Sequence, residues 1–266
     1  MSPANAENLW SDPPESVAPS PDQLDVWRLR LSLHRELLQQ FEPMLDDSQR
    51  RRASEFRFPE LRERYILRHG LLRLVLASYI QRLPGDIRFE IGAHGKPRLA
   101  PESGAVHFNL ADSGDLAVIA VAGADVGIDV EQVNQRQPPL EIVPQLHESE
   151  RLAVETSDQL RRAEVLYQIW VRKEAYLKCR GEGIGVVQLH KFAVPCADSA
   201  GKSLWQIPTE DGAFHGCDFV AAQNSLACVV RRKSIGALRL FDASPSWAQR
   251  TLRSFERHKY LLALAR

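Results

Sequence analysis

The hydrophobic and polar positions of residues 126–131 alternate, in the order Val-Gly-Ile-Asp-Val-Glu. A period of two with β-branched residues is typical of a strand whose two faces have different surroundings. This period places Asp129 and Glu131 on one face. Neighbouring carboxylates repel each other, and burying them is costly without a counter-charge. The pattern therefore predicts either a solvated edge strand or a strand that holds a hard cation such as Mg²⁺ through oxygen.

Similar patterns predict strands on both sides of this one. The predicted strands before it cover 24–33, 87–91, 106–109 and 116–121, and those after it cover 191–194, 203–207, 217–222 and 226–232. The sequence Asp-Ser-Gly-Asp at 112–115 predicts a turn between two of these strands. Residues 132–144 are rich in proline and predict a loop.

Helical periodicity predicts helices in both halves of the chain. They cover 34–42, 46–57, 62–83, a segment that ends near residue 180, and 244–263. The sequence Thr-Ser-Asp-Gln at 156–159 has the spacing of a capping box, so we expect the fourth helix to begin there and to stop at Gly181. Ser244 is the expected N-cap of the last helix, with Pro245 at its first position.

Two of these helices place charged side chains on one face. Arg64 and Arg68 lie four residues apart, as do Glu174 and Lys178, and Trp170 lies one turn before Glu174. A tryptophan, an acid and a lysine on one face suit phosphate and metal chemistry. Solvated surface residues and an ordinary Glu–Lys surface pair explain the same patterns, so the spacing alone leaves both interpretations open.

The order of the predicted elements indicates an α+β fold with two similar halves. Residues 115–120 weakly resemble residues 225–230, and a basic helix precedes the strands in each half. The expected divisions are a disordered leader at 1–22, an N-terminal half at 23–124, a C-terminal half with the metal site at 125–235, and an extension with a helix at 236–266.

Composition excludes several classes of protein. The chain of 266 residues has 34 basic and 34 acidic side chains, which argues against a dedicated nucleic-acid binder. Its four cysteines form no Cys-x-x-Cys pair, and no secretory signal is present, so we expect reduced thiols in the cytoplasm. The longest apolar runs are far too short to cross a bilayer. A cytoplasmic protein outside membranes is therefore expected.

Several short motifs, taken together, resemble a known enzyme family. They are Gly-Ile-Asp-Val-Glu at 127–131 and Trp-Val-Arg-Lys-Glu-Ala-Tyr-Leu-Lys at 170–178, preceded by Gly-Lys-Pro at 95–97 and His-Phe-Asn at 107–109. The set resembles the signature of the 4′-phosphopantetheinyl transferases, in the two-halved, single-chain type that activates peptide and polyketide synthetases. The resemblance extends over about residues 45–232.

The resemblance implies an α+β fold of two pseudo-symmetric halves that bind coenzyme A and Mg²⁺ at their interface. It implies transfer of the 4′-phosphopantetheine arm to a serine of an apo acyl or peptidyl carrier protein, with release of adenosine 3′,5′-bisphosphate. The expected partners are coenzyme A and that carrier protein, with no nucleic acid and no membrane. We expect a monomer.

The resemblance also suggests catalytic and metal-binding roles. Asp129, Glu131 and Glu174 are similar to the Mg²⁺ ligands of the family. Glu174, or a metal-bound water, would take the proton of the serine hydroxyl. Lys178 is similar to a residue that contacts the pyrophosphate and steadies the departing phosphate, and Lys173 is a second candidate for coenzyme A binding.

Other matched positions concern the 3′-phosphoadenosine end of coenzyme A. Arg64, Arg68 and Lys96 resemble residues that hold it. The family usually has Ser and His where this chain has Ala111 and Asp112, and in relatives those two side chains contact the 3′-phosphate. An anionic Asp112 in that place is expected to repel the phosphate.

Two alternatives remain on sequence grounds. A nuclease with an Asp…Glu-x-Lys site would need a lysine that the sequence Glu-Gln-Val at 131–133 lacks. A coenzyme A- or carrier-binding protein that has lost transferase chemistry finds support in Asp112 alone, while the complete set of acidic and lysine residues argues against it.

Overall fold

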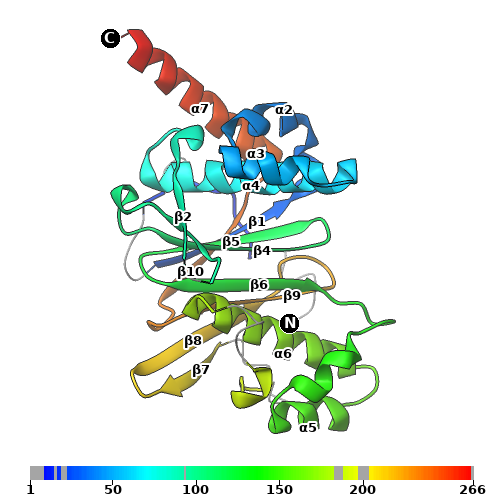
Figure 1. Ribbon diagram of the computed structural model, residues 1–266. Coiled ribbons are helices and arrows are strands. Elements are labelled where there is room, and N and C mark those ends of the chain that lie inside the picture. Colours follow the sequence, from blue (N-terminus) through cyan, green and yellow to red (C-terminus); the bar gives the residue numbers. More distant parts are fainter. Residues whose placement is uncertain are drawn as a thin grey trace.

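The computed structural model describes residues 9–14, 17–18, 23–92, 94–182, 188–196 and 204–264. Its strands form two four-stranded sheets that are stacked face to face, with helices covering the outer face of each sheet (Figure 1). The predicted mixed α+β class is confirmed. Among the described residues, no helix has the length and apolar character that a membrane span requires.

The first sheet contains strands from both ends of the chain. It consists of β1 (Gln23–Arg30), β4 (His107–Ser113), β5 (Leu116–Ala122) and β10 (Ala237–Asp242). The strand order is β10-β1-β5-β4, and β10 pairs parallel to β1 while the other neighbours are antiparallel. The segment 236–266, expected as an extension, thus provides an edge strand of this sheet. β4 forms the opposite edge.

The second sheet is antiparallel throughout. It consists of β6 (Val126–Gln132), β7 (Leu204–Thr209), β8 (Gly212–Phe219) and β9 (Ser225–Arg231), in the order β6-β9-β8-β7. A separate hairpin pairs β2 (Phe89–Ile91) with β3 (Pro97–Leu99). Small and β-branched side chains fill the space between the two large sheets, among them Val26, Ile128 and Val229.

Helices form the two outer layers. The α-helices are α2 (Leu38–Phe41), α3 (Asp47–Ser54), α4 (Pro59–Ile80), α5 (Glu148–Thr156), α6 (Arg162–Arg180) and α7 (Pro245–Leu264), and the 3₁₀ segments are η1 (Leu31–Leu37), η2 (Glu42–Met44), η3 (Pro84–Asp86), η4 (Pro101–Ser103), η5 (Leu140–Gln145) and η6 (Leu189–Lys191). α4 covers the first sheet and α6 covers the second (Figure 1). α7, whose role the sequence does not indicate, packs Trp247 against Trp27 of β1 at a ring distance of 5.0 Å.

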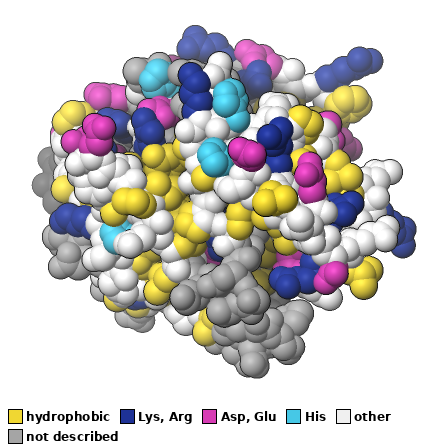
Figure 2. Space-filling model, turned by 90° about the horizontal axis from the view of Figure 1, so that it is seen from below, with side chains coloured by type: hydrophobic (Ala, Val, Ile, Leu, Met, Phe, Trp, Pro, Cys, Tyr) yellow, Lys and Arg dark blue, Asp and Glu magenta, His cyan; other side chains and the backbone are white. Residues whose placement is uncertain are grey.

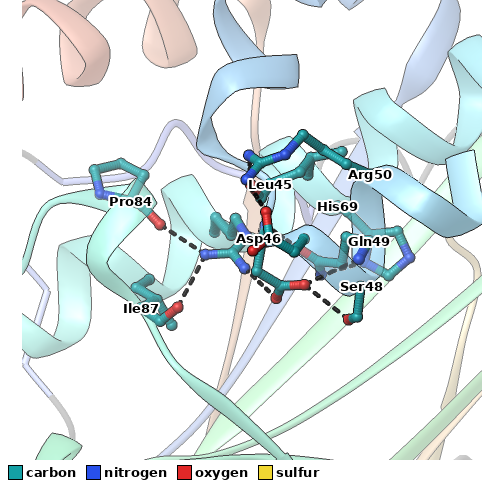
Figure 3. A network of polar contacts seen from close by, with 10 residues as sticks. Leu45, Asp46, Ser48, Gln49, Arg50, His69, Pro84 and Ile87 are labelled. Carbon is teal, nitrogen blue, oxygen red and sulfur yellow. Dashed lines mark hydrogen bonds and ion pairs between the residues drawn. The ribbon is translucent and has the colours of Figure 1, made fainter.

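A fully buried arginine fastens α3 to α4. Arg73 donates through Nε to Gln49 Oε1 at 2.8 Å and through Nη2 to Asp46 Oδ2 at 2.7 Å, and through Nη1 to the carbonyls of Pro84 and Ile87 (Figure 3). Asp46 is also the N-cap of α3, in a capping box with Gln49. The carboxylate that starts one helix therefore neutralises the charge buried by the other.

The predicted start of the fourth helix, which is α6 in the structure, is wrong. Residues 156–159 do not cap it, and α6 begins at Arg162, without a side-chain cap. The capping box lies earlier, where the ring of His147 and the carboxylate of Glu150 begin α5. The predicted stop at Gly181 is confirmed, since Gly181 has a φ of 74° and its N–H donates to the carbonyls of the last turn.

Three other expectations also need correction. Residues 191–194 form no strand: Lys191 is the last residue of η6, and 192–194 are irregular. β10 was not expected. The leader at 1–22 is not disordered throughout, because Trp10 is buried and donates to the Val220 carbonyl at 3.1 Å, and Ser11 bridges to Phe241. A large aromatic ring on the sheet edge explains this order; the rest of 1–22 lies mostly outside the described residues.

Candidate functional site

Two carboxylates face α6 because β6 alternates as its sequence predicts. Val126, Ile128 and Val130 point into the core between the sheets. The intervening residues therefore point to α6, and Gly127 is the first of them. A Cβ on Gly127 would lie 2.0 Å from the Ala175 carbonyl oxygen. The missing side chain lets the backbone of α6 approach β6 closely, beside the strand's acidic residues.

The closest polar contact between β6 and α6 joins Asp129 and Lys178. Lys178 Nζ lies 2.6 Å from Asp129 Oδ1 and 4.0 Å from Glu174 Oε2. Burial raises the pKa of Asp129 to about 7, although Lys178 opposes the shift, and Glu174 and Glu131 add to it. Burial also raises the pKa of Glu174. The site therefore holds more negative charge than a single ammonium group can neutralise.

Glu131 is held from the other sheet. Its Oε2 accepts a hydrogen bond of 2.8 Å from Ser113 Oγ, which in turn accepts from the backbone N–H of Gln132. Further along the same edge, Asn109 Oδ1 accepts from the N–H of Ile128 at 2.8 Å. Side chains of β4 thus supply the hydrogen bonds that join the edge strand of the first sheet to that of the second. The carboxylates lie along this seam.

The acidic residues suit a hard cation, although they do not yet converge on one. Within the described residues, no group of three or more His, Cys, Asp or Glu side chains is arranged to hold a metal as it stands. Asp129 Oδ2 is buried and has no hydrogen-bond partner in the described part of the chain. An oxygen without a partner, beside carboxylates that repel each other, fits Mg²⁺, which needs one or two carboxylates in addition to phosphate or water.

A second group of charged residues lies on the α4 side of β4. Arg64 approaches the carboxylate of Asp112 to 3.3 Å, and Arg68 also donates to it. We call the hollow that they line with Phe56, Leu61 and Tyr65 the arginine pocket; its volume is about 160 Å³. The turn predicted at 112–115 is confirmed between β4 and β5 but is shorter, because β4 extends to Ser113 and only 114–115 form the turn.

Lys96 lies apart from the arginine pocket. Its ammonium donates to the Val126 carbonyl at 2.8 Å, and burial lowers its pKa. It lines a different hollow, of about 100 Å³, together with Arg98, His107 and Asp125. The structure therefore does not bring together the three residues that were expected to hold one end of coenzyme A. Arg64 and Arg68 are neighbours, whereas Lys96 lies near the start of β6.

Lys173 does not reach any of these hollows, and its predicted role in coenzyme A binding is wrong. Its side chain is 0% exposed and pairs with Glu150 of α5 at 2.9 Å. The ammonium also donates to the carbonyls of Leu189 and Phe192. Lys173 precedes Glu174 on the helix, so the two side chains point in different directions. Lys173 joins α5 and η6 to α6.

Several residues of the site have no clear signal in the sequence. Ser113 acts through contacts between strands of different sheets, which no local pattern predicts, and the His-Phe-Asn motif at 107–109 includes Asn109 without indicating its contact with β6. Arg98 looks like an ordinary surface residue until β3 places it in one hollow with Asp125 and with His107 of β4. Gly127 has a possible signal, because an isolated glycine in a strand often marks the close approach of another backbone.

Comparison with known proteins places these motifs in one family. The profile described as the 4′-phosphopantetheinyl transferase superfamily matches residues 125–228. The 4′-phosphopantetheinyl transferase HetI of Nostoc sp. is 30% identical over 201 residues, which are 73% of this chain and 84% of the relative. The 4′-phosphopantetheinyl transferase Sfp of Bacillus subtilis is 28% identical over 61% of this chain and 71% of its own length. The corresponding enzyme psf-1 of Bacillus pumilus is 31% identical over 56% and 64%.

Proposed function

Because the chain belongs to the 4′-phosphopantetheinyl transferase superfamily, we propose that it transfers the phosphopantetheine arm of coenzyme A to a serine of an apo acyl or peptidyl carrier protein. The reaction depends on Mg²⁺ and releases adenosine 3′,5′-bisphosphate. The observation that best supports this proposal is the contact of Lys178 with both Asp129 and Glu174 at the seam between the sheets. Carboxylate oxygens are ligands that Mg²⁺ prefers, and an ammonium group stabilises the negative charge of a pyrophosphate.

The residues of this site have complementary roles in the proposed reaction. Asp129, Glu131 and Glu174 would hold Mg²⁺, which would neutralise charge on the pyrophosphate. The serine Oγ forms a bond to the phosphorus that carries the pantetheine arm, and the bond to the bridging oxygen breaks. Glu174, with its raised pKa, accepts the serine proton. Lys178 turns from Asp129 to the departing phosphate and stabilises its negative charge.

The architecture supports a site between two related halves. Each large sheet has a long helix on its outer face, α4 in one case and α6 in the other (Figure 1). We propose that these units are the pseudo-symmetric halves, with coenzyme A lying along the seam of β4 and β6. A cytoplasmic location and a monomeric state remain predictions.

The carrier protein needs an apolar surface beside basic residues. Leu140, Leu152 and Leu160 are 45%, 59% and 87% exposed around α5 and the approach to α6. A hollow in this region is lined by Val143, Val154 and Arg162, among others. The underside of the molecule shows apolar side chains interspersed with basic, acidic and histidine ones (Figure 2). We propose this face for the acidic carrier, since exposed apolar patches often mark partner sites.

A carrier-modification assay tests the proposed function. The purified protein is incubated with coenzyme A, Mg²⁺ and apo acyl or peptidyl carrier proteins, and the intact carrier mass is measured. One phosphopantetheine group should be added, and a carrier with alanine in place of the acceptor serine should stay unmodified. The non-catalytic alternative loses its main support, because Asp112 is paired with two arginines rather than left as a free anion. If the protein bound coenzyme A but modified none of the carriers tested, the result would favour that alternative.

A further inference from the structure

The arginine pocket contains an anion supplied by the protein itself. Asp112 accepts from Nη2 of Arg64 and Nη1 of Arg68, while its own side chain is 22% exposed. Two guanidinium groups and one carboxylate leave a net charge of one positive unit. An anionic ligand that enters this pocket therefore meets a carboxylate on the donors that would otherwise bind it.

The pocket also retains donors that Asp112 does not use. The Nε–H groups of Arg64 and Arg68 are buried and have no acceptor within the described residues. The ring of Tyr65 lies 5.5 Å from that of Phe56, and the Arg68 guanidinium stacks above Tyr65 at 5.6 Å. Buried donors without acceptors are costly in a folded protein. A hollow with such donors and aromatic walls fits a phosphorylated ring system.

The position of Asp112 links this pocket to the carboxylates of β6. Asp112 and Ser113 are consecutive on β4, so their side chains point to opposite faces. Ser113 contacts Glu131 at 2.8 Å, whereas Asp112 contacts the arginines. The contact to Glu131 and the arginine pocket therefore lie on opposite faces of the edge strand β4, one residue apart. Coenzyme A, the proposed substrate, carries both a pyrophosphate and a ribose 3′-phosphate.

We propose that Asp112 is a specificity-determining residue that competes with the ribose phosphate for Arg64 and Arg68. The Asp112 carboxylate already occupies donors of both arginines and repels a phosphate that approaches them, so it offsets part of the attraction of the two guanidinium groups. This chain therefore discriminates less sharply between coenzyme A and 3′-dephospho-coenzyme A than a variant with a neutral residue at 112. The inference rests on the proposed function for the identity of the ligand.

Nucleotide binding tests the proposal without a carrier protein. Isothermal titration calorimetry compares adenosine 3′,5′-bisphosphate with adenosine 5′-monophosphate for the wild type, Asp112→Asn and Asp112→Ala. The preference for the bisphosphate is the ratio of the dissociation constant of the monophosphate to that of the bisphosphate. It should rise at least about tenfold in both variants, which corresponds to about 1.4 kcal/mol of binding free energy. Asp47→Asn is the matched control, because it removes one negative charge from a side chain that is 86% exposed and pairs with Arg50 instead. Its preference should equal that of the wild type.

The outcomes separate this proposal from the proposed function. Thermal unfolding first confirms that the variants are folded, and the isosteric Asp112→Asn carries the test if Asp112→Ala is not. An unchanged preference, or equal tightening of both nucleotides, overturns the role of Asp112. The transfer rates with coenzyme A and 3′-dephospho-coenzyme A are then measured on an apo carrier. If the protein transfers phosphopantetheine but the Asp112 variants show no change in nucleotide preference, only the role of Asp112 is refuted. If the preference changes but no transfer occurs, only the proposed transferase function is refuted.

Discussion

Gly127→Ala tests whether the close contact of β6 and α6 builds the site. The added Cβ would lie 2.0 Å from the Ala175 oxygen and 2.3 Å from the Cys179 nitrogen, whereas ordinary contacts are 3.4–4 Å. Both neighbours are backbone atoms, so no side-chain rotation can relieve the clash. α6 must retreat by about 1 Å, and overpacking of this kind costs about 3 kcal/mol of unfolding free energy. The better strand propensity of alanine offsets less than about 1 kcal/mol of this.

The same displacement should reduce activity. Glu174 and Lys178 lie on the part of α6 that would move, while Asp129 stays on the strand. A misplacement of about 1 Å between reacting groups can lower a rate by about 100-fold. Urea denaturation followed by tryptophan fluorescence gives the stability, and the rate of carrier modification gives the activity.

Gly85→Ala is the control for this experiment. The nearest atom to its added Cβ, the Met44 Cα, is at an ordinary distance of 3.8 Å. Its stability should stay within about 0.5 kcal/mol of the wild type. If Gly127→Ala were as stable and as active as Gly85→Ala, the contact between β6 and α6 would not be what positions the site.

Three further predictions concern charge and packing. Without divalent metal, the unfolding free energy should fall by up to about 4 kcal/mol as pH rises from about 4 to about 7. The reason is that the folded protein holds a proton on Asp129 that the unfolded chain releases. Denaturation measured across this pH range should show no such loss for Asp129→Asn. Arg73→Met should lower the unfolding free energy by about 3–5 kcal/mol in urea denaturation, since it removes the buried charge that pairs with Asp46 and donates to Gln49. Arg35→Ala, at an exposed site, should lower it by less than about 1 kcal/mol. Leu152→Ser should raise the KM for the carrier protein but not the KM for coenzyme A in steady-state kinetics. A normal KM for the carrier protein would show that the carrier does not dock on this face.

The sequence predicts the parts of the fold and site that depend on local periodicity. The alternation at 126–131 places Asp129 and Glu131 on one face, and the structure confirms it through the buried valines of the other face. The spacing of Glu174 and Lys178 likewise places both on the side of α6 that meets β6. A period of two or of about four residues acts within one element, and the sequence displays it directly.

Features that depend on distant residues could not be predicted. Lys173 looks like a site residue until Glu150, a residue of another helix, neutralises it in the core. Asp112 looks like an unpaired anion until Arg64 and Arg68 of α4 pair with it. The pairing of β10 with β1 joins the two ends of the chain. In each case the partner is defined by the packing of separate elements, which short sequence patterns do not contain.

The most direct test of the account is carrier modification by Asp129→Ala in the presence of Mg²⁺. The wild-type protein should add one phosphopantetheine group from coenzyme A to an apo carrier, and release of adenosine 3′,5′-bisphosphate should match it mole for mole. The variant should stay folded, because the substitution relieves repulsion among Asp129, Glu131 and Glu174, and it should lose most of the transfer rate. A folded Asp129→Ala protein with near-normal turnover would contradict the assignment of this carboxylate to the metal and of the seam to the active site.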